Sequence, residues 1–368
     1  MNHHDPLIRI SKRGELLPTW KAWGIRVIAL LLSLVACALV IFAIVHMNPI
    51  KVYGTMFDGA FGSSKRSWVT VRDAMTMLCI AVGLAPAFKM RFWNIGAEGQ
   101  ILVGGIATAA CMIYLKNLPT LLLMLVMIVA SLIAGGLWGL LPGLFKARWK
   151  TNETLFTLMM NYIAIQLTSF FVAQWENPPG SNSVGVINMN SGNQGWLPNL
   201  FSEGFNRDYG WNVIIVLAVT LFMYLYMNKS KHGYEIAVIG DSENTARYAG
   251  IRVNRAYVRT IVLSGAICGL AGFVAVSGAS HSISTSTAGG RGFTAIIVAW
   301  LAQFNSVVMV IYSFLIVFLE KGAIEIASQY SLSKEVSSMV TGIILFFLLG
   351  SEFFVNYNVR FRGKKVAK

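Results

Sequence analysis

The chain has 368 residues, of which 55% are hydrophobic and 12% are charged, and its mean hydropathy is +0.61. Soluble domains carry about 25% charged residues, so this composition excludes a soluble enzyme, a DNA-binding domain and a disordered protein. Thirty Lys and Arg against 16 Asp and Glu give a formal charge of +14. Because these charges lie in short stretches between long apolar runs, the sequence predicts an all-α, polytopic membrane protein with no nucleic-acid partner.

The apolar runs define three regions. Residues 1–24 form a polar and basic N-terminal segment, residues 25–355 a transmembrane region, and residues 356–368 a basic tail. The first apolar run lacks a small-residue cleavage site, so we expect it to be a retained helix. About ten spanning helices are expected from runs of suitable length, at about 25–46, 68–88, 97–116, 119–145, 154–175, 211–228, 259–279, 293–304, 305–323 and 337–355. The eighth run is too short to cross alone, so a broken or tilted segment is expected there.

Most Lys and Arg residues fall on one side of this arrangement, which places both termini in the cytoplasm. The outer loop 176–210 is rich in Asn, Gly, Ser and Pro, whereas the inner loop 228–259 is basic. Within the inner loop, Asp241 or Ser242 can cap a helix, Glu243 suits its first turn, and Gly250 can end it. We therefore expect a short cytoplasmic helix at 242–250.

Polar residues interrupt two apolar runs. Glu98 and Gln100 begin the third run beside Gly96 and Gly99. A carboxylate is unfavourable in a membrane unless it is paired, and Gly-rich breaks occur where transporters bind solute. Two interpretations remain open: a half-helix that lines a solute pathway, or an interfacial Glu98 that pairs with Lys89 or Arg91.

A comparable break covers residues 284–294. The second to fifth spans begin outside and the seventh to tenth begin inside, so an inverted repeat of two four-helix units is expected, with the breaks at corresponding positions. Further polar residues inside apolar runs favour helix packing at least as much as solute contact; they are Asp73, Asn161, Tyr162, Gln166, Trp300, Gln303, Glu320 and Glu325.

Motifs of catalysis and nucleotide binding are absent from the sequence. There is no GxxxxGK[ST] phosphate loop, no HExxH and no GxSxG, and the four cysteines lie in apolar runs without a CxxC pair. We therefore expect no enzymatic activity, no metal and no bound cofactor.

Four segments together resemble one family. The runs Phe92–Gln100 (FWNIGAEGQ), Thr151–Ala164 (TNETLFTLMMNYIA), Tyr234–Ser264 and Gly290–Leu301 (GRGFTAIIVAWL) are similar to the ribose/branched-chain-amino-acid type of ABC-importer permease, in its nucleoside and simple-sugar branch. The resemblance covers about residues 70–350. The chain departs from the family pattern at Trp93 and at Thr245.

The resemblance implies a nucleoside importer of the bacterial cytoplasmic membrane that works by alternating access. The implied partners are cytosolic ABC ATPases that hydrolyse the ATP, a second permease subunit, an extracytoplasmic solute-binding protein and membrane lipid. The implied pathway residues are Asn94, Glu98, Gln100, Asn161, Gly290, Gly292 and Thr294. The implied ATPase-coupling residues are Glu243, Arg247, Tyr248 and Gly250.

Three alternatives remain. The first is a permease for a simple sugar such as ribose or galactose. The second is an ion-coupled secondary transporter, which would use Asp73, Glu98, Glu320 and Glu325 as relay residues and would have no need of a docking helix at 242–250. The third is a membrane enzyme, which has no recognisable catalytic set in this sequence.

Overall fold

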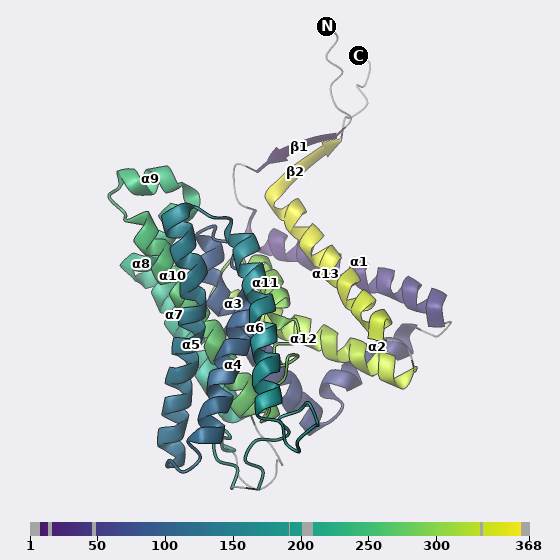
Figure 1. Cartoon of the computed structure of the whole chain (residues 1–368). Helices are drawn as coiled ribbons and strands as arrows, with labels where there is room; N and C mark the ends of the chain where they lie inside the picture. The colour runs from purple at the N-terminus through teal and green to yellow at the C-terminus, as the bar shows by residue number, and fades with distance from the viewer. Residues whose placement is uncertain are drawn as a thin grey trace, which may run out of the picture. The chain divides into compact units, whose positions relative to one another are not determined.

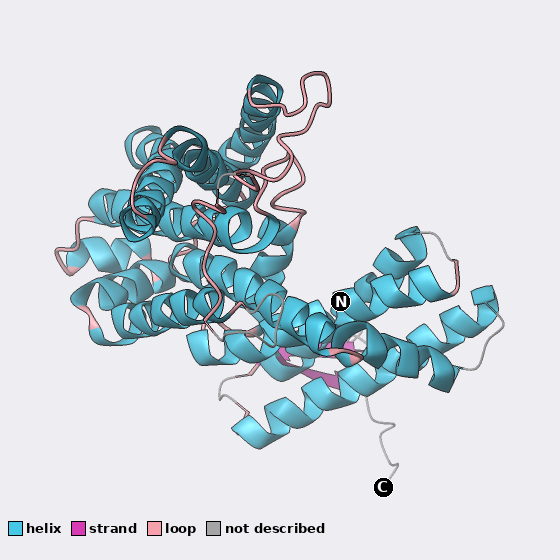
Figure 2. Ribbon diagram, turned by 90° about the horizontal axis from the view of Figure 1, so that it is seen from below, coloured by secondary structure: helices cyan, strands magenta, loops and turns pink. Residues whose placement is uncertain are grey.

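The computed structural model describes residues 8–13, 17–45, 49–190, 192–200, 209–331 and 334–361. Within them the chain is almost entirely helical, with one short pair of strands (Figure 2). Nine of the described helices are long and apolar enough to cross a membrane. The expectation of an all-α, multi-pass membrane protein is therefore confirmed. The chain divides into two compact units, residues 63–317 and residues 1–62 with 318–368.

The unit of residues 63–317 contains both predicted breaks and the helices that follow them. Its elements are α3 (Ser64–Lys89), α4 (Ala97–Tyr114), α5 (Thr120–Trp149), α6 (Glu153–Gln174), α7 (Gly210–Lys229), α8 (Lys231–Asp241), α9 (Glu243–Tyr248), α10 (Val253–Ala275), a π-helical turn (Val276–Ser280) and α11 (Arg291–Leu301).

Helix α10 is the centre of this unit and packs against α3, α4 and α5 (Figure 1). The helices approach closely because glycines face each other where they cross. A Cβ atom at Gly269 would lie 2.3 Å from the carbonyl oxygen of Ser131 on α5, and one at Gly104 would lie 2.3 Å from the carbonyl oxygen of Gly269. Small residues are the usual means of tight helix packing in lipid, where apolar burial alone gives little driving force.

The other unit is built on α1 (Thr19–Val45) and α13 (Lys334–Asn356), which pack together. It also holds α2 (Pro49–Phe61) and the part of α12 (Ser306–Gln329) that begins at Phe318. Arg26 and Glu352 form an ion pair of 2.7 Å between α1 and α13. Strand β1 (Ile8–Lys12) pairs antiparallel with β2 (Tyr357–Phe361) and so joins the two ends of the chain.

The predicted spans agree with the helices, with informative differences. The eighth run is the short helix α11, as its length indicated. Helices α2 and α8 were not anticipated, and part of the expected basic tail forms β2. Residues 1–7 and 14–16 of the N-terminal segment, residues 191 and 201–208 of the outer loop, and residues 362–368 of the tail lie outside the described residues. The inverted repeat stays a prediction, since its second half is divided between the two units.

Replacing Gly269 with Ala should destabilise the unit of residues 63–317 by about 1–3 kcal/mol, because the added methyl group meets the backbone of α5. The matched control is Gly136→Ala on α5, where the nearest atoms would lie 3.5 Å away in ordinary contact. Thermal unfolding of both purified variants in detergent measures the difference. Equal unfolding temperatures would show that the crossing is looser than the structure indicates.

Candidate functional site

The chain leaves the helical conformation between α3 and α4, and buried amide side chains hold this break together. Asn94 is fully buried, and its Nδ2 donates to Oε1 of Gln100 at 3.3 Å and to Oγ of Ser264 at 3.1 Å. Gln100 Nε2 in turn donates to Oδ1 of Asn94 at 3.3 Å, and the same oxygen accepts the backbone N–H of Gly96. The two amides therefore satisfy each other and one free backbone donor of the break.

One face of α6 supplies the remaining partners of the break. Thr157 and Asn161 stand four residues apart and so share a face of the helix. Asn161 accepts the N–H of Gly99 at 2.8 Å and donates to the carbonyl of Ile95 at 2.9 Å, while Thr157 accepts the N–H of Ile95. Asn161 thus binds the first turn of α4.

Glu98 joins the first turn of α4 to the first turn of α11. Its carboxylate accepts the backbone N–H of Gly290 at 2.7 Å and that of Gly292 at 2.9 Å. Free amide hydrogens and the helix dipole make such an N-terminus a natural anion site. Gly290 has a φ of +77°, and a Cβ atom at Gly292 would lie 2.6 Å from the backbone nitrogen of Glu98. Both glycines are therefore required by the geometry.

A polar cavity of about 400 Å³ lies at the N-terminal end of α11. Arg291 forms an ion pair of 3.1 Å with Asp73, which is 1% exposed and also pairs with Arg72 at 2.8 Å. The other polar side chains that line this cavity are hydroxyls, namely Ser280, Ser282, Ser284, Ser286 and Thr287. Hydroxyl groups can both donate and accept, so this part of the lining can form hydrogen bonds with the hydroxyl groups of a solute.

A second cavity, of about 500 Å³, lies at the C-terminal end of α11 and is lined by four aromatic and three charged side chains; we call it the aromatic cavity. Trp93 and Trp300 stack with ring centroids 5.6 Å apart, and both indoles are partly exposed. The remaining lining residues come from the end of α3, from α8 and from the segment after α11, and they are Phe88, Lys89, Arg91, Ala237, Gly240, Asp241 and Phe304. Helix α11 therefore separates a hydroxyl-lined cavity from an aromatic one.

Helix α9 forms where the expected cytoplasmic helix was placed. Ser242 accepts the N–H of Thr245 as its N-cap, Glu243 pairs with Arg247 at 2.8 Å, and Gly250 follows with a φ of +76°. Tyr248 is 94% exposed. The start and stop signals are thus confirmed, and the helix presents an aromatic side chain outward.

Helix α8, which precedes α9, connects it to the aromatic cavity. Glu235 accepts a hydrogen bond from the guanidinium of Arg259 on α10 at 2.9 Å. Burial raises the pKa of Glu235, but Arg259 and His232 favour its charged form more strongly, so the pKa is lowered overall. Gly240 packs against the carbonyl oxygen of Lys89, which a Cβ atom at Gly240 would meet at 2.0 Å. Helix α8 therefore lies between α9 and the residues that line the aromatic cavity.

The structure brings together six of the seven predicted pathway residues: Asn94, Glu98, Gln100, Asn161, Gly290 and Gly292. Thr294 is the exception, because its hydroxyl donates to the carbonyl of Gly290 at the start of its own helix rather than to a side chain of this network. In the structure the Glu98 carboxylate accepts backbone N–H groups of Gly290 and Gly292, rather than pairing with Lys89 or Arg91 as one interpretation of the sequence proposed.

None of the seven lies among the residues that line the two cavities, so their contact with solute stays a prediction. The sequence reasoning placed a break at 284–294 and weighed Trp300 for solute contact, but it did not single out Ser280 and Ser282 as lining groups or expect Trp93 to stack on Trp300. The Ser/Thr run and the unusual Trp93 were the available signals. Within the described ranges, no three His, Cys, Asp or Glu side chains are placed to hold a metal ion.

Comparison with known proteins gives a consistent result. A family model described as branched-chain amino acid transport system / permease component matches residues 69–349. The chain is 30% identical over 345 residues to the guanosine ABC transporter permease of Bacillus subtilis, covering 93% of this chain and 95% of the relative. It is 27% identical to the nucleoside ABC transporter permease of Lactococcus lactis, over 82% and 84% of the two chains. It is 26% identical to the glucose ABC transporter permease of Haloferax volcanii, over 93% and 91%.

Replacing Glu98 with Gln should destabilise the chain by about 1–3 kcal/mol, because the amide group can accept only one of the two backbone N–H groups and leaves the other buried without a partner. Glu176→Gln is the matched control, since Glu176 also accepts two backbone N–H groups, from Gly180 and Asn182, but in an exposed loop. Thermal unfolding measures both. A loss no larger for Glu98→Gln than for the control would refute the importance of the buried contact.

Proposed function

The chain belongs to the family of branched-chain amino acid transport system permease components, and on that premise we propose that it is the membrane-spanning subunit of an ABC importer that carries nucleosides into a bacterial cell. The observation that carries the proposal is the short helix α11 between two chemically different cavities. A solute that crosses between them passes α11, which is too short to span the membrane itself.

The lining of the two cavities fits the two halves of a nucleoside. The hydroxyls of Ser280–Thr287 match the hydrogen-bonding groups of a ribose. The faces of Trp93 and Trp300 match a planar base, because aromatic rings stack on the face of any nucleobase. Curated relatives named as guanosine and nucleoside permeases support this choice of solute.

The sides of the membrane follow from charge. Lys89, Arg91 and the basic loop that carries α9 lie at the aromatic end of α11, and such residues collect in the cytoplasm. The aromatic cavity is then the inner one, and the hydroxyl-lined cavity receives solute from an extracytoplasmic binding protein. Both termini lie in the cytoplasm on this assignment.

The driving force comes from cytosolic ATPases that dock on α9. This helix offers an exposed Tyr248 and the Glu243–Arg247 pair. ATP binding would shift α9 and α8, and the contact of Gly240 with the Lys89 carbonyl would pass the shift to the inner cavity. Alternating access follows if α11 and α4 move together, since Glu98 joins their first turns. A second permease subunit, identical or related, completes the pathway, and the chain itself hydrolyses nothing.

A simple-sugar importer is the second candidate, and the hydroxyl-lined cavity favours it as much as it favours a nucleoside. The 26% identity to a glucose permease points the same way. The aromatic cavity distinguishes the two, because a base gains more from a stacked pair of indoles than a sugar does.

Uptake by cells that express the complete transporter should be higher for labelled guanosine than for labelled glucose or ribose, and it should stop when ATP is depleted. Trp300→Ala should lower guanosine uptake about tenfold, since loss of base stacking costs about 1–3 kcal/mol. Tyr162→Ala, which removes an exposed aromatic ring of α6, is the control. Preferred uptake of a sugar would replace the nucleoside assignment, and uptake that persists without ATP would replace the ABC mechanism.

Tyr248→Ala should weaken docking of the ATPase subunits and lower solute-stimulated ATP hydrolysis about tenfold, since truncating a central aromatic contact of an interface costs about 2 kcal/mol or more. The control is Tyr114→Ala, which removes an exposed tyrosine at the C-terminal end of α4. Co-purification and ATPase activity are the measurements. Full stimulated hydrolysis by Tyr248→Ala would refute the coupling role of α9.

A further inference from the structure

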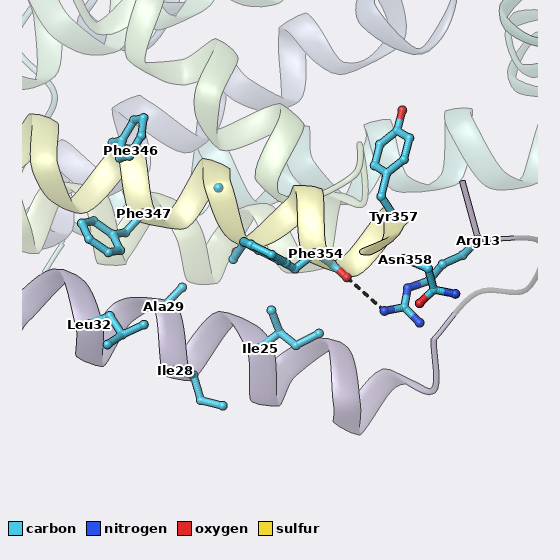
Figure 3. A pocket seen from close by; sticks show the side chains of 12 residues that line it. Arg13, Ile25, Ile28, Ala29, Leu32, Phe346, Phe347, Phe354, Tyr357 and Asn358 are labelled. Carbon is cyan, nitrogen blue, oxygen red and sulfur yellow. Dashed lines mark hydrogen bonds between the residues drawn. The ribbon is translucent and has the colours of Figure 1, made fainter. Parts of the chain in front are cut away.

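A pocket of about 740 Å³ lies between α1 and α13 (Figure 3). Its walls are apolar on both sides. Helix α1 contributes a stripe at helical spacing, and α13 contributes phenylalanines around a glycine; together these residues are Ile25, Ile28, Ala29, Leu32, Phe346, Phe347, Gly350 and Phe354. The volume lies in the range of about 300–1,000 Å³ that is typical of small-molecule sites.

One end of the pocket carries a cation. Figure 3 shows Arg13 beside Asn358 at the end away from Leu32 and Phe346. Arg13 Nη2 donates to the carbonyl of Phe354 at 3.3 Å, whereas its buried Nε finds no hydrogen-bond partner among the described residues. A buried N–H group without a partner is unfavourable, so an acceptor is expected at this end.

The two strands next to Arg13 and Asn358 in the chain are basic in sequence. In the ladder of β1 and β2, Arg9 stands opposite Arg360, and Lys12 stands opposite Tyr357. No Asp or Glu occurs in residues 356–368, which contain five Lys and Arg. Basic segments next to a spanning helix attract anionic lipid headgroups, by about 1 kcal/mol for each Lys or Arg near the surface.

Aromatic side chains indicate the depth of the pocket in the membrane. Trp20 and Trp23 lie in the first turns of α1, and they are 72% and 37% exposed. Tryptophan collects at the level of the headgroups. The end that carries Arg13 therefore lies at headgroup depth, and the apolar walls extend into the hydrocarbon region.

We propose that this pocket binds one anionic phospholipid, with an acyl chain along the walls of α1 and α13 and the phosphate at Arg13. The inference is independent of the transported solute, since the pocket lies wholly within the unit of residues 1–62 and 318–368. A zwitterionic lipid has the same acyl chains but no net charge. The site should therefore bind an anionic lipid more tightly than a zwitterionic one.

The test is native mass spectrometry of the full-length chain with its co-purifying partners in mild detergent, titrated with phosphatidylglycerol, phosphatidylcholine and inorganic phosphate. One phosphatidylglycerol adduct should form at least about tenfold more tightly than any phosphatidylcholine adduct. Arg13→Gln should weaken it about tenfold, because a charge-assisted hydrogen bond is worth about 1.5–3 kcal/mol. Lys21→Gln, which removes one positive charge from the same segment but does not line the pocket, should weaken it clearly less than Arg13→Gln does.

A second variant tests the apolar walls without altering charge. A Cβ atom at Gly350 meets nothing within 4 Å, so Gly350→Leu places a side chain in the pocket and should abolish the tight adduct. Gly342→Leu on the same helix, also with open space around its Cβ position, is the matched control. The proposal is overturned by equal binding of the two lipids, by displacement of phosphatidylglycerol with inorganic phosphate, or by a tight adduct that survives Gly350→Leu. It is equally overturned if Gly350→Leu changes only the number of copies of this chain in the complex, because a second copy then occupies the pocket.

Discussion

The contact between the Glu98 carboxylate and the backbone amides of Gly290 and Gly292 constrains the rest of the unit of residues 63–317. A carboxylate among apolar helices needs strong partners, and the first turn of α11 supplies two of them. The contact joins segments that are 192 and 194 residues apart in the chain. It therefore fixes where the short helix α11 begins, and with it the position of both cavities.

Buried amides and hydroxyls extend that constraint to neighbouring helices. Asn161 of α6 holds the first turn of α4, and Asn94 links the break to Gln100 and Ser264. Each of these side chains satisfies a backbone or amide group that the interrupted helices leave without an internal partner. The broken region is thereby a defined, hydrogen-bonded structure.

The two units of the chain are packed in different ways. Glycines at the crossings of α4, α5 and α10 allow backbone contact and make that core resistant to change. In the other unit, α1 and α13 enclose a pocket between larger side chains. A tight core suits the helices beside the proposed solute pathway, whereas a pocket with a cationic end suits the proposed lipid.

The sequence by itself determined the membrane class, the short length of α11, the break before α4 and the caps of α9. Those features depend on local composition and on the chemistry of single residues such as Ser242 and Gly250. Only the tertiary structure decided that Glu98 binds the amides of α11, that Trp93 stacks on Trp300, and that α8 contacts the Lys89 carbonyl. The physical reason is that each of these contacts joins residues far apart in the chain, and a distance across the fold leaves no periodic or compositional signal in a single sequence.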